Sequence, residues 1–190
     1  MKYIKTISFI FIVCVIISCI KNKNTGNAKK IIVEWVGETI LFPQNLDCMM
    51  RDSMMQCPET DNSNYKILLY IDSLGCTSCR TKLPKWRKLI VESDTLFENK
   101  PDFLFFFQPK INGIKELKIL LKSNGFDYPV FVDRENKIMQ LNSFPKEPEY
   151  QCFLLDKNNK VVIVGNPIYN PAIWELYKKI IRENGNADER

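Results

Sequence analysis

The sequence predicts a mixed α/β fold in which helices cover a central sheet. Two short apolar runs, Lys66–Asp72 and Asp102–Phe107, are typical of strands buried on both faces. Helical patterns separate the strands, and this alternation is typical of α/β folds. Near the C-terminus, Gln151–Asp156 and Lys160–Gly165 flank a short polar turn and predict a β-hairpin. We therefore expect a mixed central sheet flanked by helices, with a late β-hairpin and a C-terminal helix.

The other elements follow from the same patterns. Ile31–Phe42 alternates around a turn at Gly37-Glu38 and predicts one or two short strands, whereas the polar stretch Pro43–Asn64 predicts a long loop. Apolar residues at helical spacing predict a helix over Cys76–Glu92. Three further elements complete the order: an amphipathic helix at Ile114–Lys122, a strand at Tyr128–Asp133 and a helix at Pro171–Glu183, which has proline in its first turn.

Composition limits the chemistry that the chain can perform. With 190 residues, 45% hydrophobic and 26% charged, the chain suits one globular domain with short extensions. The net charge of +5 comes from scattered lysines and arginines, so we expect no nucleic-acid partner. Histidine is absent, which excludes histidine-based nucleophilic catalysis and histidine-ligated zinc or copper. The seven cysteines are the reactive side chains that remain.

The N-terminus has the pattern of a secretory signal. Two lysines within Met1–Lys5 precede the apolar run Ile7–Ile17, which is shorter than the roughly 20 residues of a spanning helix. The run ends in Ile16-Ile17-Ser18-Cys19, which resembles the bacterial lipobox. That resemblance implies lipidation of Cys19 and a membrane-anchored lipoprotein facing the periplasm, on the inner or outer membrane. The alternative is an uncleaved signal anchor with a cysteine there by chance.

Four segments follow from these patterns. We expect a signal peptide at residues 1–18 and a lipid anchor with a flexible tether at residues 19–30, because Lys21–Lys30 is polar and has no apolar period. A single folded domain should span residues 31–184, followed by a C-terminal tail at residues 185–190.

The most informative motif is Cys76-Thr77-Ser78-Cys79, which directly follows a predicted buried strand and opens a predicted helix. A helix N-terminus stabilises a thiolate, so the pKa of Cys76 should fall. Two intervening residues let Cys79 reach Cys76 and resolve a mixed disulfide. Gly75, just before the pair, allows the backbone of a partner to approach closely.

This arrangement resembles the thioredoxin superfamily, in which a proline five residues after the second cysteine kinks the helix. Pro84 occupies that offset from Cys79, and the added strand at Phe126–Asp133 is similar to membrane-anchored TlpA/ResA-type proteins. The resemblance implies a thioredoxin-like fold and a thiol–disulfide oxidoreductase in which Cys76 attacks and Cys79 resolves. It implies protein dithiols or disulfides as partners, and neither a bound cofactor nor a metal.

The chain departs from the superfamily pattern at two positions. The slot of the cis-proline that shapes the substrate groove holds Tyr150, with Pro148 nearby, so the expected groove comprises Gly75, Pro148 and Tyr150. Where relatives often have a buried acid, six residues before the first cysteine, this chain has Tyr70.

Several alternatives stay open. Cys48 and Cys57 could form a structural disulfide, remain free thiols, or complete a zinc site with Cys76 and Cys79. Cys152, within a predicted strand, is expected to be a small buried apolar residue, and the alternative is a third thiol near the active pair. The leading competitor for the function is a non-enzymatic lipoprotein that uses the thioredoxin-like fold as a binding platform. A peroxidase is a further alternative, but Thr77–Arg80 does not clearly supply its supporting residues.

Overall fold

The computed structural model describes residues 26–60, 63–72, 81–110 and 112–185. The chain separates into two units, Met1–Trp35 and Val36–Arg190. In the first unit, residues 26–35 form a helix, which includes the last five residues of the expected tether. The prediction of strands over Ile31–Phe42 is therefore wrong for residues 31–35. Residues 36–42 form no strand, and their one isolated bridge joins Thr39 to Lys160.

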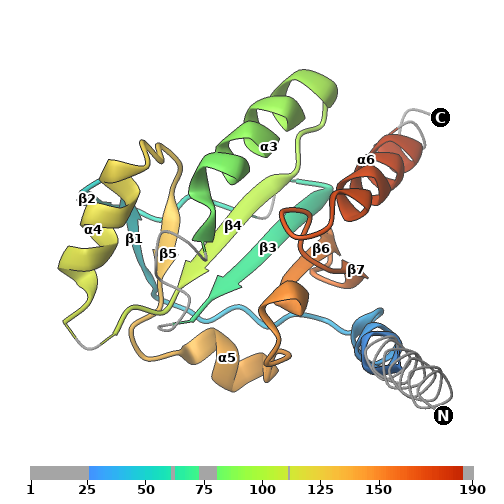
Figure 1. Cartoon of the computed structure of the whole chain (residues 1–190), viewed down its shortest axis with the longest axis horizontal. Helices are drawn as coiled ribbons and strands as arrows, with labels where there is room; N and C mark the ends of the chain where they lie inside the picture. Colours follow the sequence, from blue (N-terminus) through green and yellow to red (C-terminus); the bar gives the residue numbers. More distant parts are fainter. Residues whose placement is uncertain (1–25, 61–62, 73–80, 111, 186–190) are drawn as a thin grey trace, which may run out of the picture. The chain divides into compact units, whose positions relative to one another are not determined.

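In the second unit, seven strands of the described residues form one sheet in the order β2-β1-β5-β4-β3-β6-β7 (Figure 1). Strands β3, β4 and β5 run parallel, and the other neighbouring pairs are antiparallel. The strands predicted after residue 64 all appear: β3 at Tyr65–Ile71, β4 at Asp102–Phe107, β5 at Val130–Val132, β6 at Cys152–Asp156 and β7 at Val161–Val164. The predicted mixed α/β fold with a late hairpin is confirmed.

The segment predicted as a long loop contains the first two strands instead. Strand β1 spans Asp47–Met50 and β2 spans Ser53–Met55, and together they form a hairpin. Strand β1 pairs antiparallel with β5 and buries Cys48 and Met49. Local sequence carries little strand signal here, so pairing with the sheet decides the conformation.

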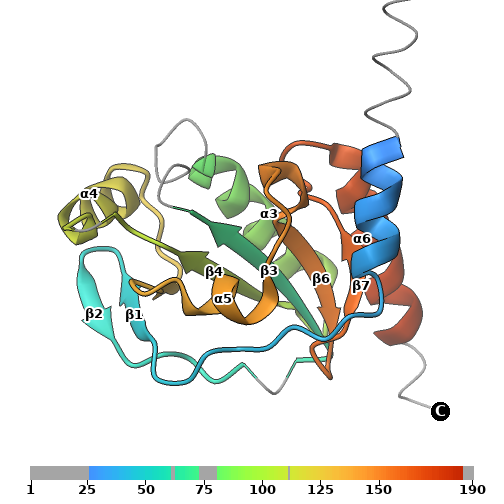
Figure 2. The same cartoon turned by 90° about the horizontal axis from the view of Figure 1, so that it is seen from below.

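Helices cover the two faces of the sheet unequally. Helices α3 (Leu83–Leu96), α4 (Ile114–Ser123) and α6 (Pro171–Gly185) lie on one face, and α5 (Lys137–Asn142) lies on the other (Figures 1 and 2). The main core lies under the first three helices. Its centre is Trp86 of α3, whose ring meets the ring of Phe105 edge-on at 5.4 Å. Because aromatic side chains bury large apolar areas, this contact fixes α3 against β4.

Two short helical elements were not predicted. Helix α5 begins after Asp133, whose carboxylate accepts hydrogen bonds from the backbone N–H groups of Lys137 (2.9 Å) and Ile138 (2.8 Å). The 3₁₀ helix η1, at Pro148–Tyr150, precedes β6. Both elements are too short to give a periodic apolar pattern.

Within the described ranges, no helix is both long and apolar enough to cross a lipid bilayer.

Candidate active site

The predicted cysteine pair lies between the end of β3 and the start of α3. Cys76, Cys79 and Gly75 fall within residues 73–80, outside the described residues. The residues on either side, Asp72 and Thr81, are described, and both line the same pocket. The two ends of the cysteine segment therefore meet at one place on the molecule, the C-terminal end of a parallel strand, where α/β folds commonly place their ligands.

The pocket has a volume of about 40 Å³ and is formed by four segments. The end of β3 and the residues Thr81 and Trp86 supply one part of its lining. Residues 148–151 and the loop between β7 and α6 supply the other part, which we call the rim. Its lining combines apolar and uncharged polar side chains with one carboxylate: Leu69, Tyr70, Ile71, Asp72, Thr81, Trp86, Pro148, Gln151, Asn166, Ile168 and Tyr169. A small apolar pocket with a few polar groups suits one side chain of a partner molecule.

The helix after the cysteine segment is interrupted. Thr81 is helical, but Lys82 has φ 48° and ψ 38°, in the left-handed region, and α3 begins at the next residue. Pro84 lies in the first turn of α3, where its missing N–H leaves no bond unmade. The expected kink is thus a break at Lys82, and the interpretation of Pro84 as an interior helix residue is wrong.

Tyr70 does not take the role of a buried acid beside the cysteines. Ile67, Leu69 and Ile71 of β3 belong to the core beneath α3, so the alternation of the strand turns Tyr70 to the opposite face. Its hydroxyl lies 2.8 Å from Asn136 Oδ1 and 3.3 Å from Gln108 Oε1. Its ring packs against Phe144. This tyrosine therefore joins β3 to the α5 side of the sheet.

The expected groove residues Pro148 and Tyr150 both lie in η1, but only Pro148 lines the pocket. The described residues contain no cis peptide bond, so a 3₁₀ turn stands where the superfamily has a cis-proline loop. Gln151 ends this turn. Its side chain is buried and donates a hydrogen bond to Pro145 O (2.8 Å), and its carbonyl accepts one from Tyr70 N (3.0 Å).

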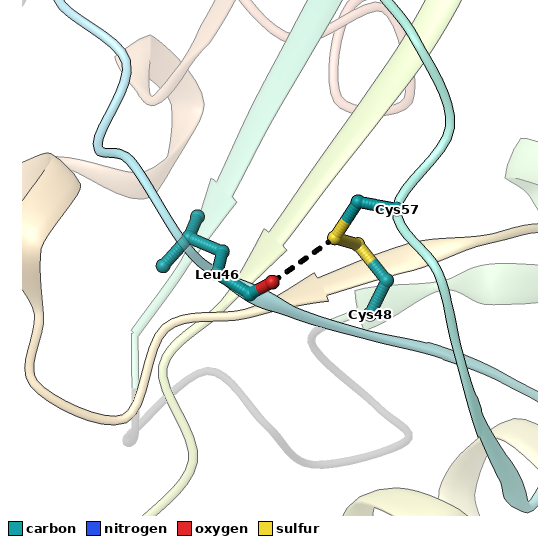
Figure 3. Close-up of a disulfide and its surroundings, with 3 residues drawn as sticks. All are labelled: Leu46, Cys48 and Cys57. Atoms are coloured by element: carbon teal, nitrogen blue, oxygen red, sulfur yellow. Dashed lines mark hydrogen bonds between the residues drawn. A yellow bond between two sulfur atoms is a disulfide. The ribbon is translucent and has the colours of Figure 1, made fainter.

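Cys48 and Cys57 are joined by a disulfide with their Cα atoms 5.0 Å apart (Figure 3). Cys48 is buried in β1, and Cys57 follows β2 with its Sγ 3.2 Å from the carbonyl oxygen of Leu46. The bond ties the chain after β2 back to β1. Zinc is bound by cysteine thiolates. While Cys48 and Cys57 are joined in a disulfide, they cannot complete a zinc site with Cys76 and Cys79.

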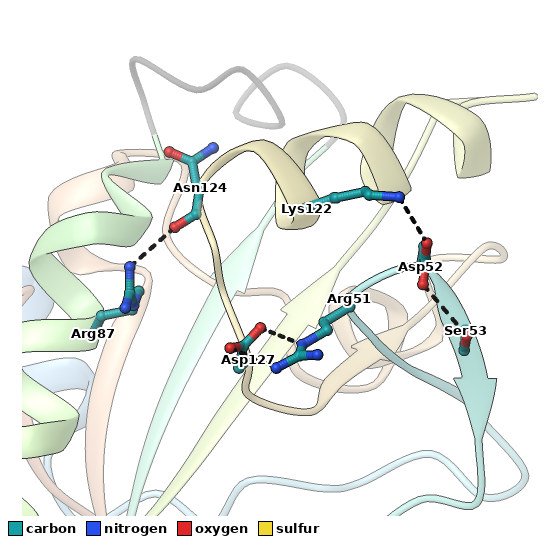
Figure 4. Close-up of polar contacts among 7 residues, drawn as sticks. All are labelled: Arg51, Asp52, Ser53, Arg87, Lys122, Asn124 and Asp127. Atoms are coloured by element: carbon teal, nitrogen blue, oxygen red, sulfur yellow. Dashed lines mark hydrogen bonds and ion pairs between the residues drawn. The ribbon is translucent and has the colours of Figure 1, made fainter.

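Ion pairs also hold the turn of this hairpin, at Arg51 and Asp52 (Figure 4). Arg51 contacts the carboxylate of Asp127 with two nitrogens, at 2.5 and 2.8 Å, and Lys122 of α4 contacts Asp52 at 3.3 Å. The hydrogen bond from Arg51 lowers the pKa of Asp127, and that from Lys122 lowers the pKa of Asp52. All four side chains are solvent-exposed, so the pairs orient the hairpin and add little stability.

Cys152 of β6 is a free cysteine and is buried, as the sequence predicts. Burial raises the pKa of its thiol to about 12. Its Sγ lies 3.8 Å from the hydroxyl oxygen of Tyr177, which donates to Gly165 O (2.9 Å). A thiol that stays protonated and enclosed cannot serve as a nucleophile at neutral pH.

Sequence reasoning missed most of the pocket rim. Lys82 lies at the helix break, and Asn166, Ile168 and Tyr169 lie in the loop after β7. No local motif marks these residues. Asn166, Ile168 and Tyr169 reach the same pocket as Asp72 and Thr81 only because β6 pairs with β3 and β7 pairs with β6.

No family model matches the sequence, and no curated protein matches it either. Solved structures do match. The thioredoxin domain of a thiol-disulfide oxidoreductase from Bacteroides vulgatus aligns over 74% of this chain and 96% of that domain, with 10% identity and a TM-score of 0.53. A candidate thiol:disulfide interchange protein DsbE from Chlorobium tepidum aligns over 74% and 93% of the two chains, with 16% identity and a TM-score of 0.53.

A third match is a candidate protein disulfide isomerase from Bacteroides thetaiotaomicron. It aligns over 78% of this chain and 88% of its own length, with 18% identity and a TM-score of 0.52. These identities are low, so the likeness concerns the arrangement of strands and helices. Together with the observed sheet and helices, it shows that this chain has a thioredoxin-like fold.

Proposed function

We propose that the protein is an extracytoplasmic thiol–disulfide oxidoreductase that exchanges disulfides with protein cysteines through Cys76 and Cys79. One observation carries the proposal: Asp72 and Thr81, the two described residues that flank the cysteine segment, line the same pocket. A pair of cysteines separated by two residues, between a parallel strand and a helix, suits exchange better than metal binding.

The proposed reaction conserves atoms and electrons in two displacements. The Cys76 thiolate attacks one sulfur of a partner disulfide, forms a mixed disulfide and releases the other partner sulfur as a thiolate that takes a proton. Cys79 then loses its proton and attacks the Cys76 sulfur, which frees the second partner thiolate. The partner gains two electrons and the protein keeps a Cys76–Cys79 disulfide. Another dithiol protein reduces this disulfide again, and the reverse sequence oxidises a partner.

The charge around the segment favours the first displacement. Lys82 follows the segment and is half-buried, and Arg80 is part of the segment itself. Nearby positive charge stabilises a thiolate and lowers its pKa. Asp72, just after β3, is the one carboxylate among the described pocket residues.

Two observations support a location outside the cytoplasm. The Ser18-Cys19 sequence after an apolar run fits lipidation of Cys19 and a membrane anchor. The Cys48–Cys57 disulfide ties down a hairpin, and lasting structural disulfides form in oxidising compartments. The test is mass spectrometry of the membrane fraction, which should find an acylated Cys19 at the N-terminus. A chain that retains residues 1–18 would remove the anchor from the proposal.

A trapping experiment separates the enzyme from a non-enzymatic binding platform. In the Cys79→Ser chain the mixed disulfide on Cys76 cannot be resolved, so partner proteins should accumulate on it. The Cys76→Ser chain is the matched control and should trap none. If neither chain traps a partner, and if the purified wild-type pair does not exchange with glutathione, the protein is a binding platform.

A further inference from the structure

The backbone of Lys82 is strained beside the pocket. Its φ of 48° is in the left-handed region, although it is not a glycine, and it separates helical Thr81 from α3. A residue with a side chain adopts this conformation only where its surroundings hold it there, and such residues cluster at functional sites. The contacts that hold Lys82 in this conformation therefore bear on the function of the pocket.

The side chain of Lys82 reaches the loop between β7 and α6. Its ammonium nitrogen lies 4.1 Å from the centre of the Tyr169 ring. Tyr169 lines the pocket and is 43% exposed, so the pair spans the rim at the solvent side. A cation over an aromatic face is attracted by the ring quadrupole, which fixes the position of the charge without neutralising it.

No carboxylate of the described residues forms an ion pair with Lys82. Lys178 of α6 shows the contrast, because it contacts both Glu92 and Glu175. An ammonium group has three N–H donors. Lys82 therefore keeps the capacity to bind an anion that arrives at the pocket.

The opposite rim is less suited to holding a peptide by its backbone. In η1 the N–H of Tyr150 donates to Glu147 O (2.9 Å) and that of Gln151 donates to Pro148 O (3.3 Å), while Glu149 O accepts from Asn166 N (2.9 Å). Strand addition needs free backbone groups, so recognition here depends more on side-chain charge. Glu149 directly follows Pro148, which lines the pocket, and its negative charge repels carboxylates.

We infer that Lys82, held in place by Tyr169, is a specificity-determining residue that selects partners with a carboxylate next to the reactive cysteine. The inference rests on the proposed exchange at Cys76 and names the chemical class of its substrates. Two carboxylates set the orientation, Asp72 in the pocket lining and Glu149 beside Pro148, because an acidic partner segment is attracted toward Lys82 and repelled from them.

The test uses three peptides that differ at one position. Each carries a single cysteine in a disulfide with 2-mercaptoethanol, next to glutamate, glutamine or lysine. The full-length reduced protein in detergent is mixed with each peptide, and the peptide thiol released is followed by acid quench and mass spectrometry. We expect the glutamate peptide to react about fivefold faster than the glutamine peptide at low salt, and the lysine peptide to react slowest. Added salt should shrink these ratios.

Variants assign the preference to this cation. Lys82→Met should bring the glutamate-to-glutamine ratio close to one, and Lys82→Arg should keep it. Tyr169→Leu, which removes the ring but not the charge, should lower the ratio partly. Lys88→Met is the matched control, because Lys88 is an exposed lysine further along α3, and it should leave the ratio unchanged.

The outcomes separate this inference from the proposed function. Reduction of all three peptides at equal rates by the wild-type protein would overturn the inference and leave the oxidoreductase proposal intact. An undiminished preference in Lys82→Met would overturn it in the same way. Failure to reduce any of the peptides would overturn both.

Discussion

The β1–β2 hairpin and the pocket at the end of β3 are built differently. The hairpin is held by a disulfide and by three ion pairs, Arg51–Asp127, Lys122–Asp52 and Arg134–Asp47, so its charged groups have partners. Beside the pocket, Lys82 instead has a left-handed backbone, and its charge meets only the ring of Tyr169 among its described contacts. Local rules of stability tend to be broken at functional sites, which are supported by the well-packed structure around them. This difference favours the pocket as the functional region and the hairpin as a structural one.

The largest effect on stability is expected where the pocket meets the core. Trp86 is 1% exposed, lines the pocket and packs on Phe105. Trp86→Ala should lower the free energy of unfolding by about 3–5 kcal/mol, because it removes a large buried side chain and leaves a cavity. Denaturant unfolding would measure this change. Val91→Ala, at an exposed position of the same helix, should change it by less than about 0.5 kcal/mol. Similar values for both variants would place Trp86 outside the core.

Removal of the hairpin disulfide should have the next largest effect. The bond closes a loop between residues nine apart, so Cys48→Ser with Cys57→Ser should lower the free energy of unfolding by about 2–3 kcal/mol. The exchange rate with glutathione should remain near the wild-type value, since these sulfurs lie outside the proposed chemistry. Loss of exchange in a double variant that is still folded would contradict the structural role given to the hairpin.

The buried thiol of Cys152 should make stability depend on alkaline pH. Its pKa is raised from 9.0 to about 12 in the folded chain, so the unfolded chain loses this proton first as the pH rises. The stabilisation is complete below pH 9 and is lost as the pH rises toward 12. Between pH 9 and 10.5 this group should contribute a loss of about 2 kcal/mol. Denaturant unfolding at the two pH values should show a smaller decrease for Cys152→Ala. Equal decreases would mean that the thiol ionises freely in the folded state.

The smallest effect is expected at Pro84. This residue lies in the first turn of α3, where proline leaves no hydrogen bond unmade. Pro84→Ala should therefore change the free energy of unfolding by less than about 1 kcal/mol, well below the roughly 3 kcal/mol expected for a proline inside a helix. A gain near the larger value would show that the helix continues through Lys82 without a break.

The sequence predicts the central strands well because their signal is local. Lys66–Asp72 and Asp102–Phe107 are apolar runs, and the structure forms β3 and β4 there. Residues 26–35 show the limit of this approach, because the β-branched Ile31-Ile32-Val33 favours a strand whereas the chain forms a helix. Strand β1 depends on pairing with β5, and β2 depends on pairing with β1. The local sequence does not encode either pairing.

The candidate site divides in the same way. The cysteine motif and Pro148 come from local sequence and from resemblance, whereas Lys82 and Tyr169 become neighbours only in the folded chain. The break at Lys82 could not be predicted either. No sequence pattern marks a lysine with a left-handed backbone. Pro84 indicated that the helix is irregular, but not that the break lies at Lys82.

The most direct test of the account is a redox titration of the full-length protein, with each cysteine identified by mass spectrometry after alkylation. Cys76 and Cys79 should titrate together as a two-electron couple at a higher potential than Cys48 and Cys57. The hairpin disulfide should stay oxidised to below about −300 mV, as is typical of structural disulfides. Burial should leave Cys152 unmodified until the chain is denatured. If the hairpin disulfide exchanges readily while Cys76 and Cys79 stay inert, the assignment of the functional and structural regions is reversed and the account is contradicted.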